Sequence, residues 1–473
     1  MKRIVIGPFN RVEGDLEIGL DIEAGTVRSA RVNSPLFRGF EQVLIGRAPE
    51  DALAIVPRIC GICSVAQSAA AAAALAQLAG VTPPPNGVLA GRLVQATENL
   101  ADHLTHFYLF FMPDFARPAY VDRDWYSEIA RRFTAQRGSA IGPWLQARAR
   151  FFNLTGFLAG RWPHTLALQP GGSTKATTAA ERIRLAALLR EFRHFVEHTV
   201  LGDTLEAFAE IGHGNALNAW AGARDSDFAL FVRAADDLGL ASIGRAKDRF
   251  LSFGAYDLFP AGLLAADLAV NPLDPAKIAE DVSHSWLIGD QPLAPAKGET
   301  RVDADKAGAY TWCKAPRYGG EVAETGALAR QLADGHPLLH DLVRHNGASV
   351  SARIVARMIE VARVVPAMEG WVHQLQPGEP FCLPAPLPDS GSAFGLVEAA
   401  RGSLGHWLSI KRGRIERYQI IAPTTWNFSP RDASGQPGPL EQALIGLPAG
   451  ENALPTIQHV VRSFDPCMVC TVH

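Results

Sequence analysis

Four of the six cysteines form two Cys-x-x-Cys pairs near opposite ends of the chain, Cys60 with Cys63 and Cys467 with Cys470. Such a pair can place two thiolates on one cation, so two pairs supply four soft ligands for zinc, nickel, iron or an iron–sulfur cluster. A zinc ribbon closes its two pairs across about 15–20 residues, whereas roughly 400 residues separate these two. We therefore expect the fold itself to bring the pairs together into one metal site.

The stretches around these pairs resemble the large subunit of the nickel-iron hydrogenases. The resemblance runs from the Arg-Val-Glu-Gly motif at residues 11–14 to His473. It implies that all four cysteines bind nickel, and that Cys63 and Cys470 also bridge to iron in a Ni-Fe(CN)2(CO) centre. From the residues alone, a structural zinc site, a redox-active disulfide pair and ordinary buried thiols remain alternatives.

The composition is that of a large globular protein. The chain has 473 residues, of which 48% are hydrophobic, and a formal net charge of -3. This supports a sizeable core and gives no sign of a nucleic-acid partner or of binding to an anionic membrane. Six cysteines are too few for a disulfide scaffold. We expect Cys313 and Cys382, which lie outside the pairs, to behave as small buried hydrophobic residues.

No residue from Ile59 to Gly91 is charged, yet this stretch is not expected to cross a membrane. It is rich in alanine, contains Gln67 and Gln77, and is stopped by the prolines at residues 83–85, which favours a buried core helix. The N-terminus has no long apolar segment typical of a signal peptide. These patterns predict a cytoplasmic protein without direct membrane insertion.

We expect a single domain of the α+β class, mainly helical, with the fold of a nickel-iron hydrogenase large subunit. Its parts are an N-terminal β-hairpin region (about 1–35), a helical body (about 41–380) and a C-terminal active-site region (about 381–473). Alternating apolar residues at 16–22 and an extended run at 27–32 predict the hairpin. Helices are predicted from Cys63 to Ala79, ended by Gly80, over 95–111, and from Thr174 or a neighbour to Thr199.

Proton transfer is assigned by the resemblance to side chains outside the cysteine pairs. Glu13 is implied to lie beside a nickel-bound cysteine and to relay protons, a role suited to a carboxyl group whose pKa a dry site raises. Arg401 is implied to lie over the open nickel–iron position, held in place by Asp114 and Asp465, because arginine donors are rigidly arranged and always charged. From residue type alone, Glu13 and Arg401 would be solvated surface residues.

Other residues are implied to contact bound groups. Leu404 would pack against the CO ligand, and Thr424 would donate a hydrogen bond to one cyanide. A magnesium ion, which prefers oxygen ligands, would be bound by Glu41, the backbone carbonyl of Ile420 and the terminal His473. A surface salt bridge is the alternative for Glu41.

Gln67 departs from the majority of the resembled family. It lies one helical turn after Cys63, where catalytic members usually carry a histidine that can donate to the bridging cysteine. Glutamine there is similar to the hydrogen-sensing, regulatory subgroup, although it can also be a tolerated polar substitution. The end at His473 fits either a chain whose tail has been removed or the sensing subgroup, whose members lack the tail.

The implied reaction interconverts H2 with two protons and two electrons. Arginine is too basic to accept the proton readily, so we favour the thiolate of Cys467 as the base, relaying to Glu13. The chain offers no further cysteine cluster, so the electrons are expected to leave through iron–sulfur clusters of a small partner subunit, in a heterodimer or a dimer of heterodimers.

Three functions remain open from the sequence. The first is a hydrogen sensor of low turnover, a regulatory hydrogenase that signals to a histidine kinase, as Gln67 suggests. The second is an energy-conserving uptake hydrogenase or a cofactor-reducing hydrogenase. The third, of another class, is a non-enzymatic protein with a structural zinc site, which metal analysis would separate from the other two.

Overall fold

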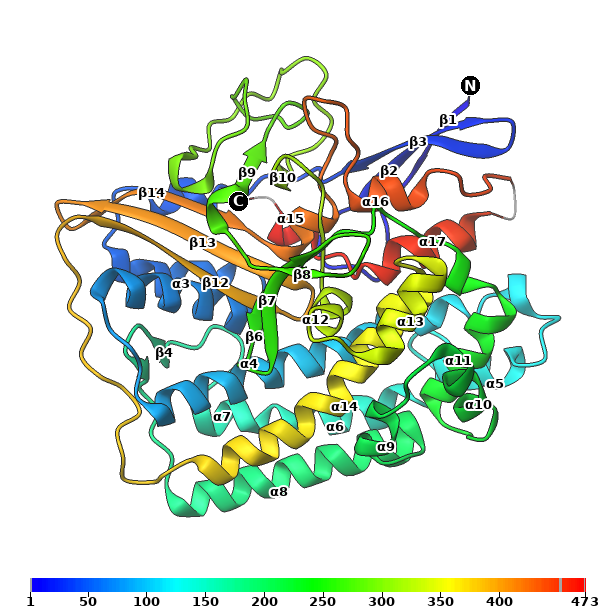
Figure 1. The fold of residues 1–473 in the computed structure, drawn as a ribbon, viewed down its shortest axis with the longest axis horizontal. Helices are drawn as coiled ribbons and strands as arrows, with labels where there is room; N and C mark the ends of the chain where they lie inside the picture. The colour runs from blue at the N-terminus through cyan, green and yellow to red at the C-terminus, as the bar shows by residue number, and fades with distance from the viewer. Residues whose placement is uncertain (1, 451–452, 472) are drawn as a thin grey trace.

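The computed structural model describes residues 2–450, 453–471 and 473. Helix is its predominant regular structure, with small sheets at the N-terminus, in the middle of the chain and near the C-terminus, so the predicted mainly helical α+β class is confirmed. In Figure 1 the long helices α8 (Ala179–Phe195) and α14 (Val350–Gln374) run along one side of the molecule, while the C-terminal sheet lies over α3 (Ser64–Ala79). No helix within the described residues is both long and apolar enough to cross a bilayer.

The helices vary widely in length, and the longest ones form the body of the molecule. The α-helices of the described residues are α1 (Phe40–Leu44), α2 (Ala52–Ile55), α3 (Ser64–Ala79), α4 (Pro85–Thr105), α5 (Tyr126–Phe133), α6 (Ile141–Phe151), α7 (Asn153–Ala159), α8 (Ala179–Phe195), α9 (Leu205–Ala209), α10 (Gly214–Gly222), α11 (Asp227–Asp237), α12 (Ala327–Ala333), α13 (Pro337–Asn346), α14 (Val350–Gln374), α15 (Pro423–Asn427), α16 (Pro439–Leu444) and α17 (Leu454–Ser463).

The strands form several small sheets, ordered β1-β2-β3, β10-β9, β11-β6-β7-β8, β12-β13-β14 and β4-β5. Their bounds are β1 (Lys2–Ile6), β2 (Glu17–Glu23), β3 (Thr26–Asn33), β4 (Leu168–Gln169), β5 (Gly172–Ser173), β6 (Phe250–Ala255), β7 (Phe259–Leu264), β8 (Val270–Asn271), β9 (Ile278–Asp281), β10 (Ala315–Tyr318), β11 (Glu324–Thr325), β12 (Gly391–Ala399), β13 (Gly402–Lys411) and β14 (Arg414–Ile421).

The N-terminal hairpin is formed as predicted by β2 and β3, which pair in antiparallel register. Its apolar residues Leu16, Ile18 and Leu20 are fully buried, as the alternating pattern requires. β1 adds a third antiparallel strand that was not predicted. Its exposed residues alternate without a strong apolar face, which explains why periodicity did not reveal it.

Three predicted helices form, with shifted ends. Gly80 ends α3 in the left-handed conformation, with φ 64°. α4 begins earlier than predicted, at Pro85, and continues past Thr105 as a π-helix, His106–Phe111. The cap of α8 is Thr178, a neighbour of Thr174, which forms a capping box with Glu181.

The predicted helical body (about 41–380) is interrupted between about 250 and 325, where β6 to β11 lie. β6 is an apolar run with almost every residue buried. A strand buried on both faces shows no alternation, so its pattern cannot be distinguished from that of a buried helix. The sheet β12-β13-β14 was likewise not predicted within the C-terminal region.

The uncharged, alanine-rich stretch forms α3, and it is a buried core helix as predicted. Its small side chains let β12 approach closely, and a Cβ atom at Gly395 would lie only 2.1 Å from the carbonyl oxygen of Ala70. This contact seats the C-terminal sheet directly on the helix that follows Cys63. The composition of α3 thus serves to bring the two ends of the chain together.

Candidate metal centre

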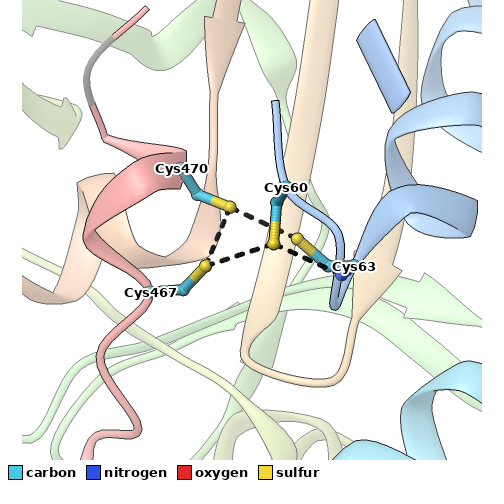
Figure 2. Close-up of side chains that lie close together, drawn as sticks. All are labelled: Cys60, Cys63, Cys467 and Cys470. Atoms are coloured by element: carbon cyan, nitrogen blue, oxygen red, sulfur yellow. Dashed lines mark hydrogen bonds between the residues drawn. The ribbon is translucent and has the colours of Figure 1, made fainter. Parts of the chain in front are cut away.

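The four paired cysteines meet in one buried cluster (Figure 2). The sulfur of Cys467 lies 3.4 Å from that of Cys60 and 3.1 Å from that of Cys470. The sulfur of Cys63 lies 3.2 Å from that of Cys470. Because all four sulfurs lie within 4.8 Å of one another, the prediction that folding joins both chain ends into one four-sulfur site is confirmed.

The sulfurs come from two short segments that enter from different sides in Figure 2. Cys63 is the N-cap residue of α3, so the amides at the positive end of this helix lie beside the cluster. Cys467 precedes a short 3-10 turn near the C-terminus, Met468–Cys470, and Cys470 is its last residue. The helix end helps to stabilise negative charge on the sulfurs.

The loop at residues 11–14 is attached to the second cysteine pair through the backbone. Glu13 and Cys467 form a parallel β-bridge, and the Met468 amide donates to the Glu13 carbonyl at 2.7 Å. Gly14 has φ +78°, and a Cβ atom there would lie 2.9 Å from the Val469 nitrogen, so this close approach requires glycine. The Glu13 side chain is half-buried, and burial together with the charge of Cys60 raises its pKa.

The cluster fits a soft metal ion better than its metal-free alternatives. The sulfur separations far exceed the roughly 2 Å of a disulfide, so the redox-disulfide alternative is not supported. Hydrogen bonds with Cys467 and Cys470, and then burial, raise the pKa of Cys63 well above its ordinary value. A raised pKa favours the protonated thiol of Cys63. A bound cation would favour the thiolate instead, because metal ligation requires thiolates.

Arg401 lies buried next to the cluster, on the turn between β12 and β13. Its Nε donates to the Asp465 carbonyl at 3.0 Å and its Nη2 to Asp465 Oδ1 at 3.1 Å. The other end of the guanidinium forms an ion pair with Asp102 on α4. Burial opposes the charge of Arg401, but Asp102 and Asp465 outweigh it and hold its pKa well above the ordinary value.

Asp114 does not hold Arg401, so this prediction was wrong and Asp102 takes that place. Both aspartates lie on one continuous helical run, and only the packing of α4 determines which of them reaches Arg401. Arg462, which binds Asp114, also donates from Nη2 to the carbonyl of Asn10 at 2.9 Å. Through Arg462, Asp114 therefore anchors the loop that carries Glu13. The guanidinium groups that bind Asp114 are those of Arg11, Arg117 and Arg462.

Asp114→Asn is expected to lower the free energy of unfolding by about 3 kcal/mol at pH 7, because one partner of a buried charge cluster is removed. Burial opposes the charge of Asp114, but Arg462 and Arg11 hold its pKa below 3.8. This stabilisation is therefore present above pH 3.8 and lost as the pH falls further. Chemical denaturation of the wild type and of Asp114→Asn at pH 7 and pH 3 measures the effect. A loss of unfolding free energy of equal size at both pH values would contradict this prediction.

Two predicted contact residues of the bound diatomic ligands lie at the cluster. The Cys467 amide donates to the Thr424 hydroxyl at 3.3 Å, which leaves the hydroxyl proton of Thr424 available for another acceptor. Leu404 is fully buried and packs in the same apolar cluster as the four cysteines. These positions agree with the predicted contacts to cyanide and CO, which stay predictions.

Glu41 is buried, so the alternative of a surface salt bridge is wrong. Its Oε1 accepts the Ile420 amide at 2.8 Å, and Lys314 Nζ donates to its Oε2 at 3.0 Å. The Glu41 amide donates to the His473 carbonyl at 3.0 Å. Both ring nitrogens of His473 are buried without a partner in the described part of the chain, and burial lowers its pKa to about 3. A neutral imidazole beside a carboxylate fits a divalent cation, which would compete with Lys314 for Glu41.

Gln67 lies in the first turn of α3 and is fully buried. Its Oε1 lies 2.8 Å from Nε2 of His406 on β13, and Nδ1 of that histidine lies 2.8 Å from the hydroxyl of Tyr418 on β14. Among the described residues, the side-chain nitrogen Nε2 of Gln67 has no hydrogen-bond partner.

Several residues near the centre were missed from the sequence. Asp102, His406 and Lys314 were given no role, and each reaches the site from an element whose position depends on tertiary packing. Glu98 on α4 accepts the amides of Val65 and Ala66 at 2.9 and 3.0 Å, and so binds the start of the helix that follows Cys63. The available signal for Asp102 and Glu98 was an acidic residue within a helix that carries many apolar residues.

Fold and site together define a metalloprotein whose centre is closed by both ends of one chain. The family described as nickel-dependent hydrogenase matches residues 38–128 and 143–473. The chain therefore belongs to the nickel-dependent hydrogenases, as a catalytic large subunit of the nickel-iron type. The alternative of a structural zinc protein is not supported.

Individual relatives match along the whole chain. It is 31% identical to the periplasmic NiFeSe hydrogenase large subunit of Desulfomicrobium baculatum, over 100% of this chain and 95% of that protein. It is 27% identical to the uptake hydrogenase large subunit of Rhodobacter capsulatus, over 100% and 95% respectively. Its structure matches that of the Ni-Fe-Se hydrogenase from D. vulgaris Hildenborough with a TM-score of 0.86 and 30% identity, covering 100% of both chains.

Proposed function

We propose that this large subunit splits H2 heterolytically at a Ni-Fe(CN)2(CO) centre bound by Cys60, Cys63, Cys467 and Cys470. The observation that carries the proposal is the backbone pairing of Glu13 with Cys467, which places a residue whose carboxyl group has a raised pKa beside a cysteine of the metal cluster. When bound, the centre would supply the Lewis acid that polarises H2.

Cys467 is the base that receives the first proton. Arg401 is also close to the cluster, but Asp102 and Asp465 hold it in its charged form, in which it has no lone pair to accept a proton. Arg401 would instead present fixed donors to the bound centre, which need no rearrangement during the reaction. The proton then passes from the Cys467 sulfur to Glu13. Because Glu13 is half-buried, it can pass the proton on, away from the cluster.

The balance of the reaction requires an exit for two electrons for each H2. The relatives named above are large subunits, and we assign the exit to iron–sulfur clusters of a small partner subunit in a heterodimer. Glu41, the Ile420 carbonyl and His473 would bind magnesium and so fix the C-terminal segment that carries Cys470. The placement of the protein in the cytoplasm stays a prediction, and one relative is named periplasmic.

Elemental analysis and infrared spectroscopy of the co-expressed two-subunit protein test this function. We expect stoichiometric nickel and iron, together with infrared bands of CO and cyanide that change when the sample is exposed to H2. Zinc in place of nickel, without CO or cyanide bands, would overturn the proposal.

Glu13→Gln is expected to slow H/D exchange by at least about 100-fold, because general acid–base groups typically contribute 10²–10⁴-fold and an amide cannot carry the proton. Burial raises the pKa of Glu13 above its ordinary value, which makes its carboxylate a better proton acceptor. The infrared bands should persist, since Glu13 is not a metal ligand. Unchanged exchange in a variant with full nickel would remove Glu13 from the proton route.

Hydrogen sensing is a second candidate, favoured by Gln67 alone. The relatives named above are described as periplasmic or uptake enzymes, which supports sustained turnover, and a histidine kinase partner has no support from them. Dye reduction under H2 distinguishes the two candidates. Turnover typical of enzymes, about 1–10³ per second, favours the uptake reaction, and turnover far below this range favours sensing.

A further inference from the structure

We propose that His406, oriented by Tyr418, is a positioning residue that fixes the side-chain amide of Gln67 with its nitrogen facing the thiolates of the metal centre. The inference rests on the proposed function, because it concerns the same four-sulfur site. It assigns roles to two residues on the C-terminal sheet that belong to neither Cys-x-x-Cys pair.

The three side chains form an unbroken buried row. Gln67, His406 and Tyr418 are at most 1% exposed. Both hydrogen bonds of the row are 2.8 Å long. His406 lies on β13 and Tyr418 on β14, whereas Gln67 lies on α3, against which this sheet packs. The row therefore ties the helix following Cys63 to the sheet that carries Arg401 at its edge.

The orientation of the Gln67 side chain sets the direction of the row. The amide oxygen of Gln67 can only accept, so Nε2 of His406 carries the proton that is donated to it. With its single N–H at Nε2, the imidazole of His406 offers Nδ1 as an acceptor, 2.8 Å from the Tyr418 hydroxyl. The Tyr418 hydroxyl then donates to Nδ1. If the Gln67 amide were rotated by half a turn, the other tautomer of His406 could accept from its NH2 group, but the amide oxygen would then face the thiolates, which offer it no donor.

This direction leaves the Gln67 nitrogen as the free donor of the row. Among the residues that the structure describes, it is buried and has no partner. Gln67 lies one turn after Cys63, the N-cap residue of α3, and the Gln67 backbone amide donates to the Cys63 carbonyl at 3.2 Å. A buried amide N–H without an acceptor is costly, and a thiolate of the loaded centre would satisfy it. His406 thus acts on the centre through Gln67.

Infrared spectroscopy of the nickel-loaded heterodimer tests the row in a double-mutant design. Gln67→Leu and His406→Leu should shift the CO and cyanide bands in the same direction, with nickel content retained. The double variant should show the same shift as Gln67→Leu alone, because His406 has no other route to the centre. Tyr418→Phe keeps the ring and should give a shift no larger than that of His406→Leu.

Two further variants complete the design. His406→Gln retains an N–H donor toward Gln67 and should restore the bands toward their wild-type positions. Tyr108→Phe removes another buried hydroxyl, bonded to Asp227 at 2.7 Å away from the site, and should leave the bands unchanged. Wild-type bands in fully loaded His406→Leu, or shifts that add in the double variant, would overturn the positioning role. Absence of CO and cyanide bands in the wild type would instead overturn the proposed function itself.

Discussion

Cys63→Ser is expected to abolish nickel retention while the chain stays folded. Cys63 is buried at the start of α3, and its sulfur lies 3.2 Å from that of Cys470. Loss of an outer hydrogen-bond partner of a metal ligand typically weakens metal affinity about 10–100-fold, so loss of the ligand itself should exceed about 100-fold. Elemental analysis of the purified heterodimer measures nickel per chain, and thermal unfolding reports on the fold.

The matched control for this substitution is Cys382→Ser. Cys382 is half-buried and lies outside the four-sulfur cluster, so its variant should retain full nickel. A serine hydroxyl is a poor ligand for soft metal ions, so the serine in Cys63→Ser should not replace the thiolate as a nickel ligand. Full nickel content together with wild-type infrared bands in Cys63→Ser would contradict the ligand role.

The parts of the site that follow from local sequence were predicted correctly, because each carries its own signal. A Cys-x-x-Cys pair identifies itself by spacing, and the helix from Ser64 to Ala79 is defined by its composition and by Gly80. Gly14 is part of a recognisable motif, and the structure shows why glycine is required there. These features depend on residues within a few positions of one another.

The parts that were missed depend on packing between distant elements. Asp102 and Asp114 are both buried acids of one helical run, and the choice between them is made by where α4 meets the turn that carries Arg401. The role of His406 becomes visible only when β13 is placed on α3. Strand β6 was misassigned because a fully buried strand has no alternating pattern. Residue type and local periodicity contain no information on these contacts.

The second large effect is expected from Arg330→Met, which changes no proposed metal ligand. Arg330 is fully buried and pairs with the carboxylates of Glu360 and Glu398. It also donates to the carbonyls of Ala399 and Ala400, immediately before Arg401, at 3.1 and 3.2 Å. Removing it leaves two buried carboxylates without their main partner, which typically costs 3–5 kcal/mol for a single pair. We expect a loss of at least about 3 kcal/mol in the free energy of unfolding at pH 7.

The pH dependence separates this ionic effect from a simple loss of packing. Burial opposes the charge of Glu360, but Arg330 and His103 hold its pKa at about 2. Its contribution is therefore present above the ordinary value of 4.5 and is lost as the pH falls toward 2. The deficit of Arg330→Met should shrink between pH 7 and pH 3, as measured by urea denaturation. Arg301→Met, which removes an exposed pair with Glu299, should leave the transition unchanged at both pH values. A deficit that stays constant with pH would mean that Arg330 stabilises the Arg401 turn through packing alone, without its charge.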